Sequence, residues 1–334
     1  MPVSLQDIAN RSGYSVKSVS GALHGGSARM SEATREKILG VAKEMGYVIN
    51  LAARATRQGW IPLIGIIADE LITTPFATDI LRGLDNAVRA RDMAVFATNF
   101  GPGRSVNSVY AELQRFRPKA IGYAAMYHKV IQLPDDVSSG LSVLINCRDA
   151  AGRVPSIVPD DEQAARDITR HLIERGRRRI AFINLPGLLA GSLREKGFIA
   201  ALAEAGLDST QAPVLPAVSA HVYTDRSRRL VQQHVEALTS GPNAVDAILA
   251  GNDRVAMEVY AALRRRNLSI PGDVAVAGFD NQVEIVTRLD PPLTTMALPH
   301  RRMGQLAAAA LLGEADLSAP VQELRFRLVQ RKST

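Results

Sequence analysis

The sequence predicts an α/β protein, in which two doubly wound parallel-sheet subdomains follow a small all-α headpiece. From Pro62 onward, short apolar runs of strand character alternate with helical stretches, as in parallel sheets covered by helices on both faces. Residues 1–59 instead contain short amphipathic helices, and they carry a net charge of +4 out of the +7 of the whole 334-residue chain.

Within residues 1–48 we expect three helices. Ser4 is a typical helix N-cap, and Gly13 can supply the tight turn that ends the first helix. A second helix is expected from Ser15, burying Val16 or Val19, and a third from Ser31. Two short helices joined by a turn that contains glycine form a helix-turn-helix.

The second helix of this motif lies in the major groove of DNA, with its N-terminal residues against base edges. Here the stretch SVKSVSGALHGG, residues 15–26, is rich in serine, contains one lysine and has no acidic residue. Short hydroxyl donors and the absence of carboxylates suit a helix that must approach phosphates. A helical hairpin whose serines only cap its ends remains the structural alternative.

The remaining residues alternate between strands and helices. Because ligands of such sheets bind at the carboxyl ends of the strands, we expect a binding cleft between the two subdomains. Strands are expected at 63–68, 93–100, 119–126, 141–146, 179–185, 246–251 and 273–279, and helices at 77–91, 105–117, 161–176, 194–206, 225–240 and 253–266.

Composition argues against several classes of protein. Cys147 is the single cysteine, so neither an intrachain disulfide nor a cysteine-rich zinc site can form, and the six histidines show no metal-ligand spacing. The start lacks the apolar core of a signal peptide, and no apolar run approaches a membrane span. We therefore expect a cytoplasmic protein with no metal, no cofactor and no membrane partner.

An enzyme is the competing interpretation, and the residues give it little support. Gly101 and Gly103 follow a strand, but the third glycine of a dinucleotide-binding loop is absent. The adjacent Asp160 and Asp161 are better explained as the polar start of a helix. We therefore do not expect catalysis.

Longer stretches are similar to a known family. VSLQDIANRSGYSVKSVSGALHGG, MSEATREKIL and EMGYVINLAARA resemble the headpiece of the LacI/GalR family of bacterial repressors. INCRD, HLIERGRRRIAFI, GNDRVAMEVYAAL and IPGDVAVAGFDN resemble the core of that family, which is similar to periplasmic sugar-binding proteins. The resemblance implies a headpiece at 1–48, a hinge helix and linker at 49–60, and an effector-binding and dimerisation core at 61–334. Its two lobes are expected at about 61–160 plus 291–320 and at 161–290 plus 321–334.

The resemblance also implies which residues contact DNA. Two positions depart from the family pattern: Gly21 stands where an arginine is usual, and Thr56 stands where the hinge helix carries a leucine. We therefore expect an operator that differs from the commonest one of the family. The implied DNA-binding residues are Ser15, Val16, Lys17, Ser18, Ser20, Gly21, His24, Arg29, Asn50, Arg54 and Thr56.

Six further residues are implied as effector contacts. Arginine, asparagine and aspartate side chains pair well with the vicinal hydroxyls of sugars, and an aromatic ring can cover a sugar face. Structural alternatives exist, since Asn252 or Asp280 could cap a helix or turn and Arg194 could be a surface cation. The implied contacts are Asp69, Phe76, Arg148, Arg194, Asn252 and Asp280.

Together these features predict a homodimeric repressor of carbohydrate uptake or catabolism genes. It would bind double-stranded DNA at a palindromic operator, because a two-fold symmetric dimer places two headpieces on two half-sites. A small sugar-like effector between the lobes would control its affinity for DNA. The alternatives are a constitutive DNA-binding protein with a non-functional cleft, and a doubly wound enzyme with a helical appendage.

Overall fold

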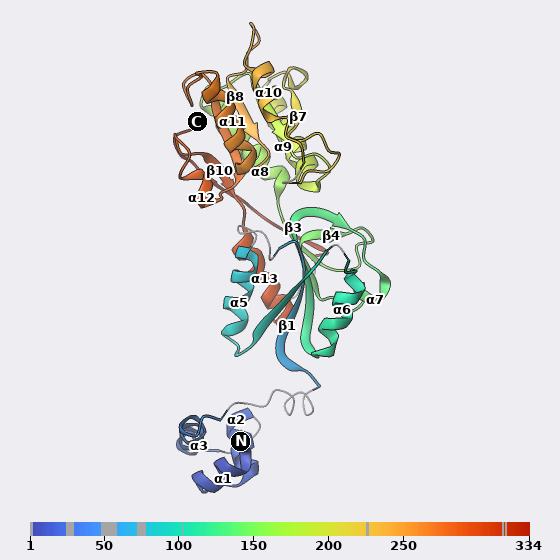
Figure 1. The fold of residues 1–334 in the computed structure, drawn as a ribbon, viewed down its shortest axis with the longest axis vertical. Coiled ribbons are helices and arrows are strands. Elements are labelled where there is room, and N and C mark those ends of the chain that lie inside the picture. The colour runs from blue at the N-terminus through green and yellow to red at the C-terminus, as the bar shows by residue number, and fades with distance from the viewer. Residues whose placement is uncertain are drawn as a thin grey trace. The chain divides into compact units, whose positions relative to one another are not determined.

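The computed structural model describes residues 3–24, 30–47, 59–71, 78–101, 103–224, 227–315, 317 and 319–334. The chain divides into two compact units, Met1–Ile61 and Pro62–Thr334. We call the first unit the headpiece and the second the core (Figure 1). Each unit has its own set of helices or sheets and is described by itself.

The described part of the headpiece forms the expected helices α1 (Leu5–Ser12), α2 (Val16–His24) and α3 (Glu32–Glu44). Ser4 caps α1 in a reciprocal arrangement: its side chain accepts from the backbone N–H of Asp7, and the Asp7 carboxylate accepts from the backbone N–H of Ser4. Gly13 ends the helix at φ 77°, in the left-handed region where a side chain is disfavoured. These local signals position α2 directly after a tight turn.

A small apolar cluster holds the three helices together. Ile8, Val19 and Ile38, one from each helix, are fully buried in it. Val16 is 37% exposed, so of the two valines considered for this role Val19 is the one that packs inside. The first turn of α2 is thereby left on the surface.

The core contains two six-stranded sheets, each of which defines a lobe. In the first lobe the strand order is β11-β5-β4-β3-β1-β2, and the pairings β1–β2, β3–β4, β4–β5 and β5–β11 are parallel. The strands are β1 (Ile61–Asp69), β2 (Ala94–Phe100), β3 (Pro118–Ile131), β4 (Val143–Asp149), β5 (Ser156–Pro159) and β11 (Val321–Leu324). The helices of this lobe are α5 (Thr78–Arg89), α6 (Val106–Arg115), α7 (Asp135–Ser138) and α13 (His300–Leu312).

The second lobe repeats this order as β12-β10-β9-β8-β6-β7, with only the edge strand β12 antiparallel to its neighbour among the registered pairs. Its strands are β6 (Ile180–Asn184), β7 (Val214–Pro216), β8 (Ala247–Ala250), β9 (Ala275–Asp280), β10 (Thr294–Ala297) and β12 (Arg327–Val329). Its helices are α8 (Asp161–Glu174), α9 (Leu189–Glu204), α10 (Val231–Leu238), α11 (Asp253–Arg265) and α12 (Val283–Val286), with a short 3-10 turn at Ser209–Gln211.

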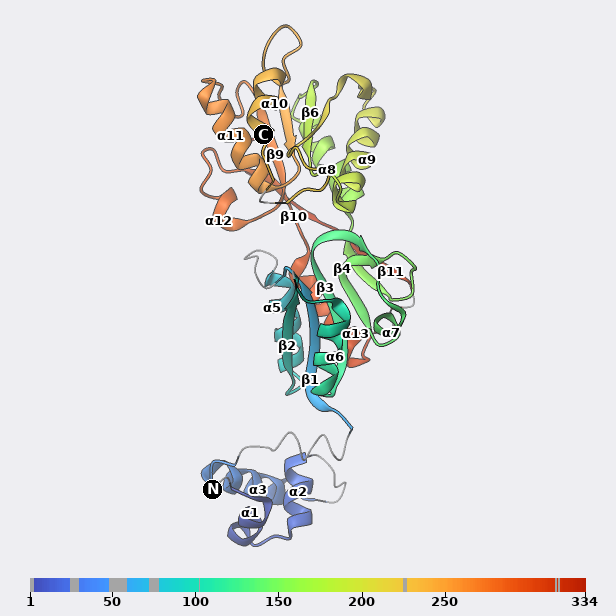
Figure 2. The same cartoon turned by 45° about the vertical axis from the view of Figure 1, so that its right-hand side comes forward.

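Helices cover both faces of each sheet. Figures 1 and 2 show α5 and α13 on one face of the first sheet, and α6 and α7 on the other. In the second lobe, α10 and α11 contribute to one apolar cluster and α8 and α9 to another. Central strands are accordingly buried on both faces, and all five residues of β6 are buried.

The chain crosses between the lobes at other points than the resemblance implies. Residues 294–297 form β10 of the second sheet, although the resemblance places 291–320 in the first lobe. Residues 321–324 form β11 of the first sheet, although the resemblance places 321–334 in the second lobe. Each crossing thus comes a few residues later, because β10 pairs with β9 and β11 pairs with β5.

One predicted helix is also shorter than expected. The helix expected at 225–240 is α10, Val231–Leu238. The residues before it take up extended backbone pairing: Leu230 N–H donates to Ala217, and Arg228 accepts from Ser219 N–H. Short elements without clear periodicity, including β5, β7, β10, β11, β12, α7 and α12, were not predicted, and neither was α13.

Candidate functional site

The first turn of α2 is the exposed edge of the helix-turn-helix. Ser15, Val16 and Lys17 are all exposed, and the first turn contains no acidic residue. The Ser15 hydroxyl accepts a hydrogen bond from the Ser18 N–H at 3.1 Å and lies 2.9 Å from the Ser18 hydroxyl. The serines therefore cap the helix, as the structural alternative expected, and they also leave its N-terminus open to an anionic surface.

Other predicted DNA contacts differ in exposure. Ser18 and Ser20 are half-buried. Gly21 is buried and, as a glycine, has no side chain that could contact a partner. His24 is the last residue of α2. Its side chain lies outside the described part of the structure, as do Arg29, Asn50, Arg54 and Thr56 together with the expected hinge helix. Their contacts with DNA remain predictions.

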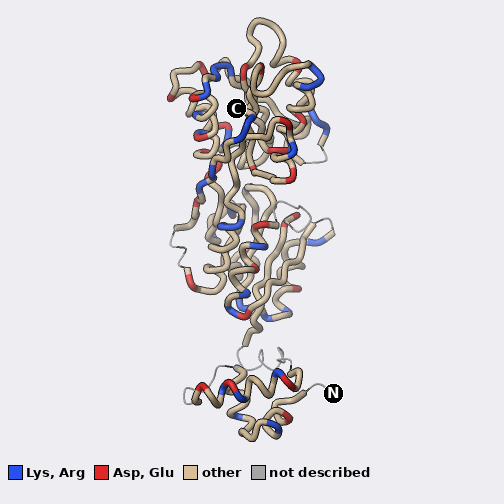
Figure 3. Tube along the Cα trace, turned by 90° about the vertical axis from the view of Figure 1, so that its left-hand side faces the viewer, with Lys and Arg blue, Asp and Glu red and all other residues tan. Residues whose placement is uncertain are grey.

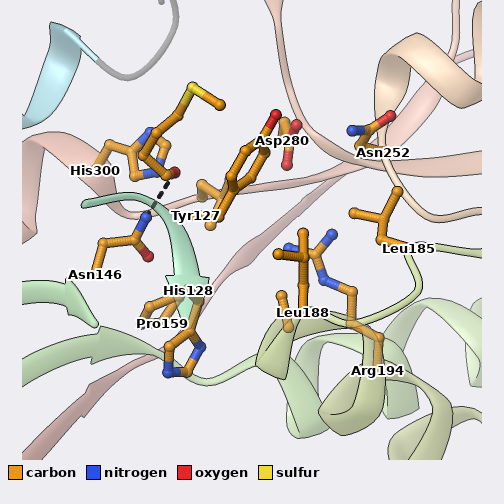
Figure 4. A pocket seen from close by; sticks show the side chains of 13 residues that line it. Tyr127, His128, Asn146, Pro159, Leu185, Leu188, Arg194, Asn252, Asp280 and His300 are labelled. Atoms are coloured by element: carbon orange, nitrogen blue, oxygen red, sulfur yellow. Dashed lines mark hydrogen bonds between the residues drawn. The ribbon is translucent and has the colours of Figure 1, made fainter. Parts of the chain in front are cut away.

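The core contains a pocket between the lobes (Figure 4). It lies where strands of both sheets end, as expected for doubly wound sheets. Three of the predicted effector contacts, Arg194, Asn252 and Asp280, line it together. The other lining residues are Met126, Tyr127, His128, Asn146, Pro159, Leu185, Leu188, Ala190, Leu298 and His300.

Arg194, on α9, is the cation of this pocket. It is 3% exposed, so the alternative of a surface cation is wrong. Its Nε donates to Asp161 at 2.7 Å and its Nη1 donates to the Gly251 carbonyl at 2.6 Å. The guanidinium carbon lies 4.3 Å from the centre of the Phe279 ring, which fixes the plane of the group.

Asp161, the first residue of α8, joins the two lobes. One carboxylate oxygen binds Arg194, and the other lies 2.7 Å from Nδ1 of His128, which belongs to β3 of the first lobe. All three side chains are buried. Burial alone would raise the pKa of the Asp161 carboxyl, but the Arg194 charge and the His128 contact hold it below its usual value. Because the carboxyl is ionised, the imidazole nitrogen is the donor in this contact.

A register shift in β3 brings His128 to this position. The pairing of β3 with β4 is regular up to Ala124 and resumes at Lys129, with an irregularity between them. The intervening residues Met126, Tyr127 and His128 line the pocket. Such irregularities re-aim side chains at functional sites.

Asn252 and Asp280 line the pocket and are also part of the local backbone structure. Asn252 caps α11 by accepting from the Val255 N–H at 2.9 Å, and its amide lies 3.4 Å from the Tyr223 hydroxyl. Asp280, at the end of β9, has φ 108°, a positive value that is uncommon for residues other than glycine. Burial raises the pKa of Asp280 to about 6, although Arg194 and a hydrogen bond from Gln282 oppose this shift.

Asp69 and Arg148 are not among the residues that line the pocket. The Asp69 carboxylate accepts from the Tyr123 hydroxyl at 2.7 Å and lies 2.5 Å from Lys129 Nζ. Arg148 pairs with Glu323 of β11 at 2.8 Å. Phe76 falls outside the described residues.

Sequence reasoning missed several residues that line the pocket or support it. The sequence indicates Asp161 only as part of a polar helix start, and its distant partners on α9 and β3 reveal its inward position. His128 and Asn146 gave no local signal, since neither belongs to a recognisable motif. In contrast, Asp160 does cap α8, accepting from the Gln163 N–H at 3.1 Å.

Across the described residues, no group of three or more histidine, cysteine, aspartate or glutamate side chains is arranged to hold a metal ion. In the same part of the chain, no helix has the length and apolar character needed to span a membrane. Acidic and basic residues are interspersed along the backbone of the core (Figure 3).

Comparison with known proteins gives consistent matches. The family described as "Bacterial regulatory proteins, lacI family" matches residues 4–50, and the "Periplasmic binding protein-like domain" matches residues 169–334. The sucrose operon repressor of Escherichia coli is 34% identical over 313 residues, which cover 92% of this chain and 93% of the repressor.

Two solved structures extend the comparison. A LacI-family transcriptional regulator from Rhizobium etli matches with a TM-score of 0.74 and 32% identity, covering 81% of this chain and 98% of that chain. The complex of the transcriptional regulator CelR with cellobiose matches with a TM-score of 0.64 and 25% identity, covering 99% of this chain and 100% of that chain. These relatives are regulators rather than enzymes. Their similarity over most of its length shows that the chain belongs to the LacI family of bacterial DNA-binding transcriptional regulators.

Proposed function

We propose that this chain is a homodimeric repressor of carbohydrate uptake or catabolism genes, acting on a palindromic operator in the cytoplasm. A small sugar-like effector, bound in the pocket between the lobes, would control its affinity for DNA. The similarity to a sucrose operon repressor and to a regulator solved with cellobiose supports a carbohydrate ligand.

The exposed first turn of α2 is the observation that best supports the proposal that the headpiece binds DNA. Ser15, Val16 and Lys17 stand on the surface of a compact helix-turn-helix, with no carboxylate beside them. A helix N-terminus of this kind can approach phosphates, and Lys17 is long enough to reach a base or a phosphate. We assign the base-reading role to this turn.

The pocket supports the control of DNA binding by a ligand. Its walls come from both lobes: His128 and Asn146 from the first sheet, and Arg194, Asn252 and Asp280 from the second lobe. A ligand that contacts both walls binds one arrangement of the lobes more tightly than another. It shifts the equilibrium between the two arrangements by its difference in binding free energy. The proposed effector contacts are therefore Arg194, Asn252 and Asp280.

Titration against a pool of randomised palindromes, followed by fluorescence anisotropy on the selected sequence, tests the DNA-binding part. We expect the wild type to select a palindrome and Lys17→Ala to relax the preference at one or two positions. Lys43→Ala, which removes an exposed charge from the end of α3, serves as the matched control and should retain the base preference. Binding by the wild type without any sequence preference would refute the proposal.

Control by a ligand needs its own measurement. The selected palindrome is titrated with and without each member of a sugar panel, and a functional effector changes the apparent affinity. By linkage, the DNA must change the affinity for the effector by the same factor. A sugar that binds the protein without altering its affinity for DNA would contradict the proposed control.

A further inference from the structure

Two residues that line the pocket each have a buried polar atom without a hydrogen-bond partner among the described residues. These atoms are Oδ1 of Asn146 and Nε2 of His128. Both residues are nearly fully buried, at 2% and 3% exposure. A buried polar atom without a partner is costly, so each is suited to a ligand group.

The neighbours of these atoms determine which hydrogen-bonding role each can take. The Asn146 amide donates to the carbonyls of Ala125 and Met126, at 3.0 and 2.8 Å, so its free atom is the carbonyl oxygen, an acceptor (Figure 4). His128 donates through Nδ1 to the Asp161 carboxylate, and in the neutral imidazole the other nitrogen is an acceptor. Asp280, when ionised, offers only acceptors as well.

The positive charge in the pocket is already matched. Arg194 is the only lysine or arginine among the described lining residues, and Asp161 pairs with it inside the protein at 2.7 Å. The Asp280 carboxyl also lines the pocket and is attracted to Arg194. An anionic ligand would therefore meet the Asp280 carboxyl, and Arg194 could not compensate it fully because Asp161 already pairs with that guanidinium.

From this pattern, and resting on the proposed function, we propose that the pocket selects an uncharged polyhydroxylated ligand and rejects phosphorylated or carboxylated sugars. Hydroxyl groups donate to Asn146 and Asp280 and can either donate to or accept from His128, whereas phosphate and carboxylate oxygens only accept and would face the acceptors of Asn146 and Asp280 unpaired. Asp161 is a specificity-determining residue in this arrangement, because it neutralises Arg194 without lining the pocket itself.

Isothermal titration calorimetry of the full chain at pH 8 with matched sugar pairs tests this proposal. The pairs are sucrose with sucrose 6-phosphate, glucose with glucose 6-phosphate, and fructose with fructose 6-phosphate. The phosphate adds about two negative charges at this pH. For any sugar that binds, we expect the phosphorylated member to bind at least about tenfold more weakly than the neutral one.

Asp161→Asn tests the role of this carboxylate, because the amide leaves Arg194 charged and unmatched. We expect this substitution to reduce the ratio of the two dissociation constants in each pair by about tenfold, mostly because the phosphorylated sugar binds more tightly. Asp160→Asn is the matched control: it removes a neighbouring charge that does not touch Arg194, and it should leave the difference unchanged. Asp280→Asn provides a second variant if Asp161→Asn does not fold, and it should also narrow the difference.

The possible outcomes separate the two proposals. Equal or tighter binding of a sugar phosphate by the wild type would overturn the inference on charge and leave a sugar-controlled repressor intact. The wild type could also prefer neutral sugars while neither Asp161→Asn nor Asp280→Asn, in folded form, changes that preference. This result would overturn the role assigned to the two carboxylates. If neither a neutral sugar nor a sugar phosphate binds, the proposed effector class fails, and the inference fails with it.

Discussion

Asp280→Asn should stabilise the core at neutral and alkaline pH. The carboxyl of Asp280 has a pKa of about 6 in the folded protein, because burial penalises its charge, while its pKa in an unfolded chain is about 4. Ionisation is therefore easier in the unfolded state. The contribution of this group to stability is fully present below pH 4 and is lost as the pH rises through 6.

The size of the effect follows from the two pKa values. Relative to low pH, the raised pKa of Asp280 lowers the free energy of unfolding by about 3 kcal/mol at pH 8 and by about 1 kcal/mol at pH 5, and the loss is below about 1 kcal/mol at pH 4. The substitution removes the titrating proton and keeps a side chain of nearly the same size and shape. The variant should therefore exceed the wild type in stability by an amount that grows with pH.

Scanning calorimetry of the full chain at pH 4, 5, 6 and 8 measures this difference as a shift in the melting temperature of the core. Asp273→Asn is the control, because hydrogen bonds from Ser269 lower the pKa of that exposed carboxyl. The Asp273 carboxyl is ionised above pH 5 in both the folded and the unfolded protein. The change in melting temperature caused by Asp273→Asn should therefore not vary between pH 5 and 8. A difference for Asp280→Asn that stays constant with pH, or a loss of stability at pH 8, would refute the reasoning.

Three further substitutions probe local packing and capping. Ser4→Ala should destabilise the headpiece by about 1 kcal/mol, since it removes the cap of α1, and circular dichroism of the headpiece transition measures the loss. Gly304→Ala should destabilise the core by about 1–3 kcal/mol, seen as a lower melting temperature in calorimetry, because its Cβ would lie 2.0 Å from the Ile80 carbonyl oxygen. Gly40→Ala, at an exposed position of α3 where an added methyl group meets no atom within 4 Å, should instead raise headpiece stability by up to about 1 kcal/mol. Shifts of the same sign for the two glycine substitutions would contradict the packing described for them.

Local chemistry made much of the fold predictable. The cap at Ser4 and the turn at Gly13 depend on neighbouring residues alone, and both appear as expected. Strands with apolar runs such as β1 and β6 are also recognisable, because a strand buried on both faces reads as a largely continuous hydrophobic run. The short strands β11 and β12 carry no such signal. The lobe to which each belongs is determined by its pairing with a strand that is distant in the sequence.

The pocket was predictable only in part, for the same physical reason. Arg194, Asn252 and Asp280 were implied by motifs and line the pocket together. Asp161 begins a helix, a position where an acidic residue is ordinary, so its burial could not be read from its neighbours. Its partners, His128 and Arg194, each lie 33 residues away along the chain.

The threading of the chain through both lobes affects how the protein is made. The first lobe has its strands β1 to β5 by residue 159, but its edge strand β11 ends at residue 324. A ribosome that adds about 5–20 residues per second needs about 8 to 33 s for the intervening segment. During that time, the nascent first lobe lacks both α13 and its outer strand, while the second lobe is being synthesised. The face of α5 that α13 later covers therefore stays exposed until residue 312 has been synthesised, and apolar surface exposed in this way is prone to aggregation.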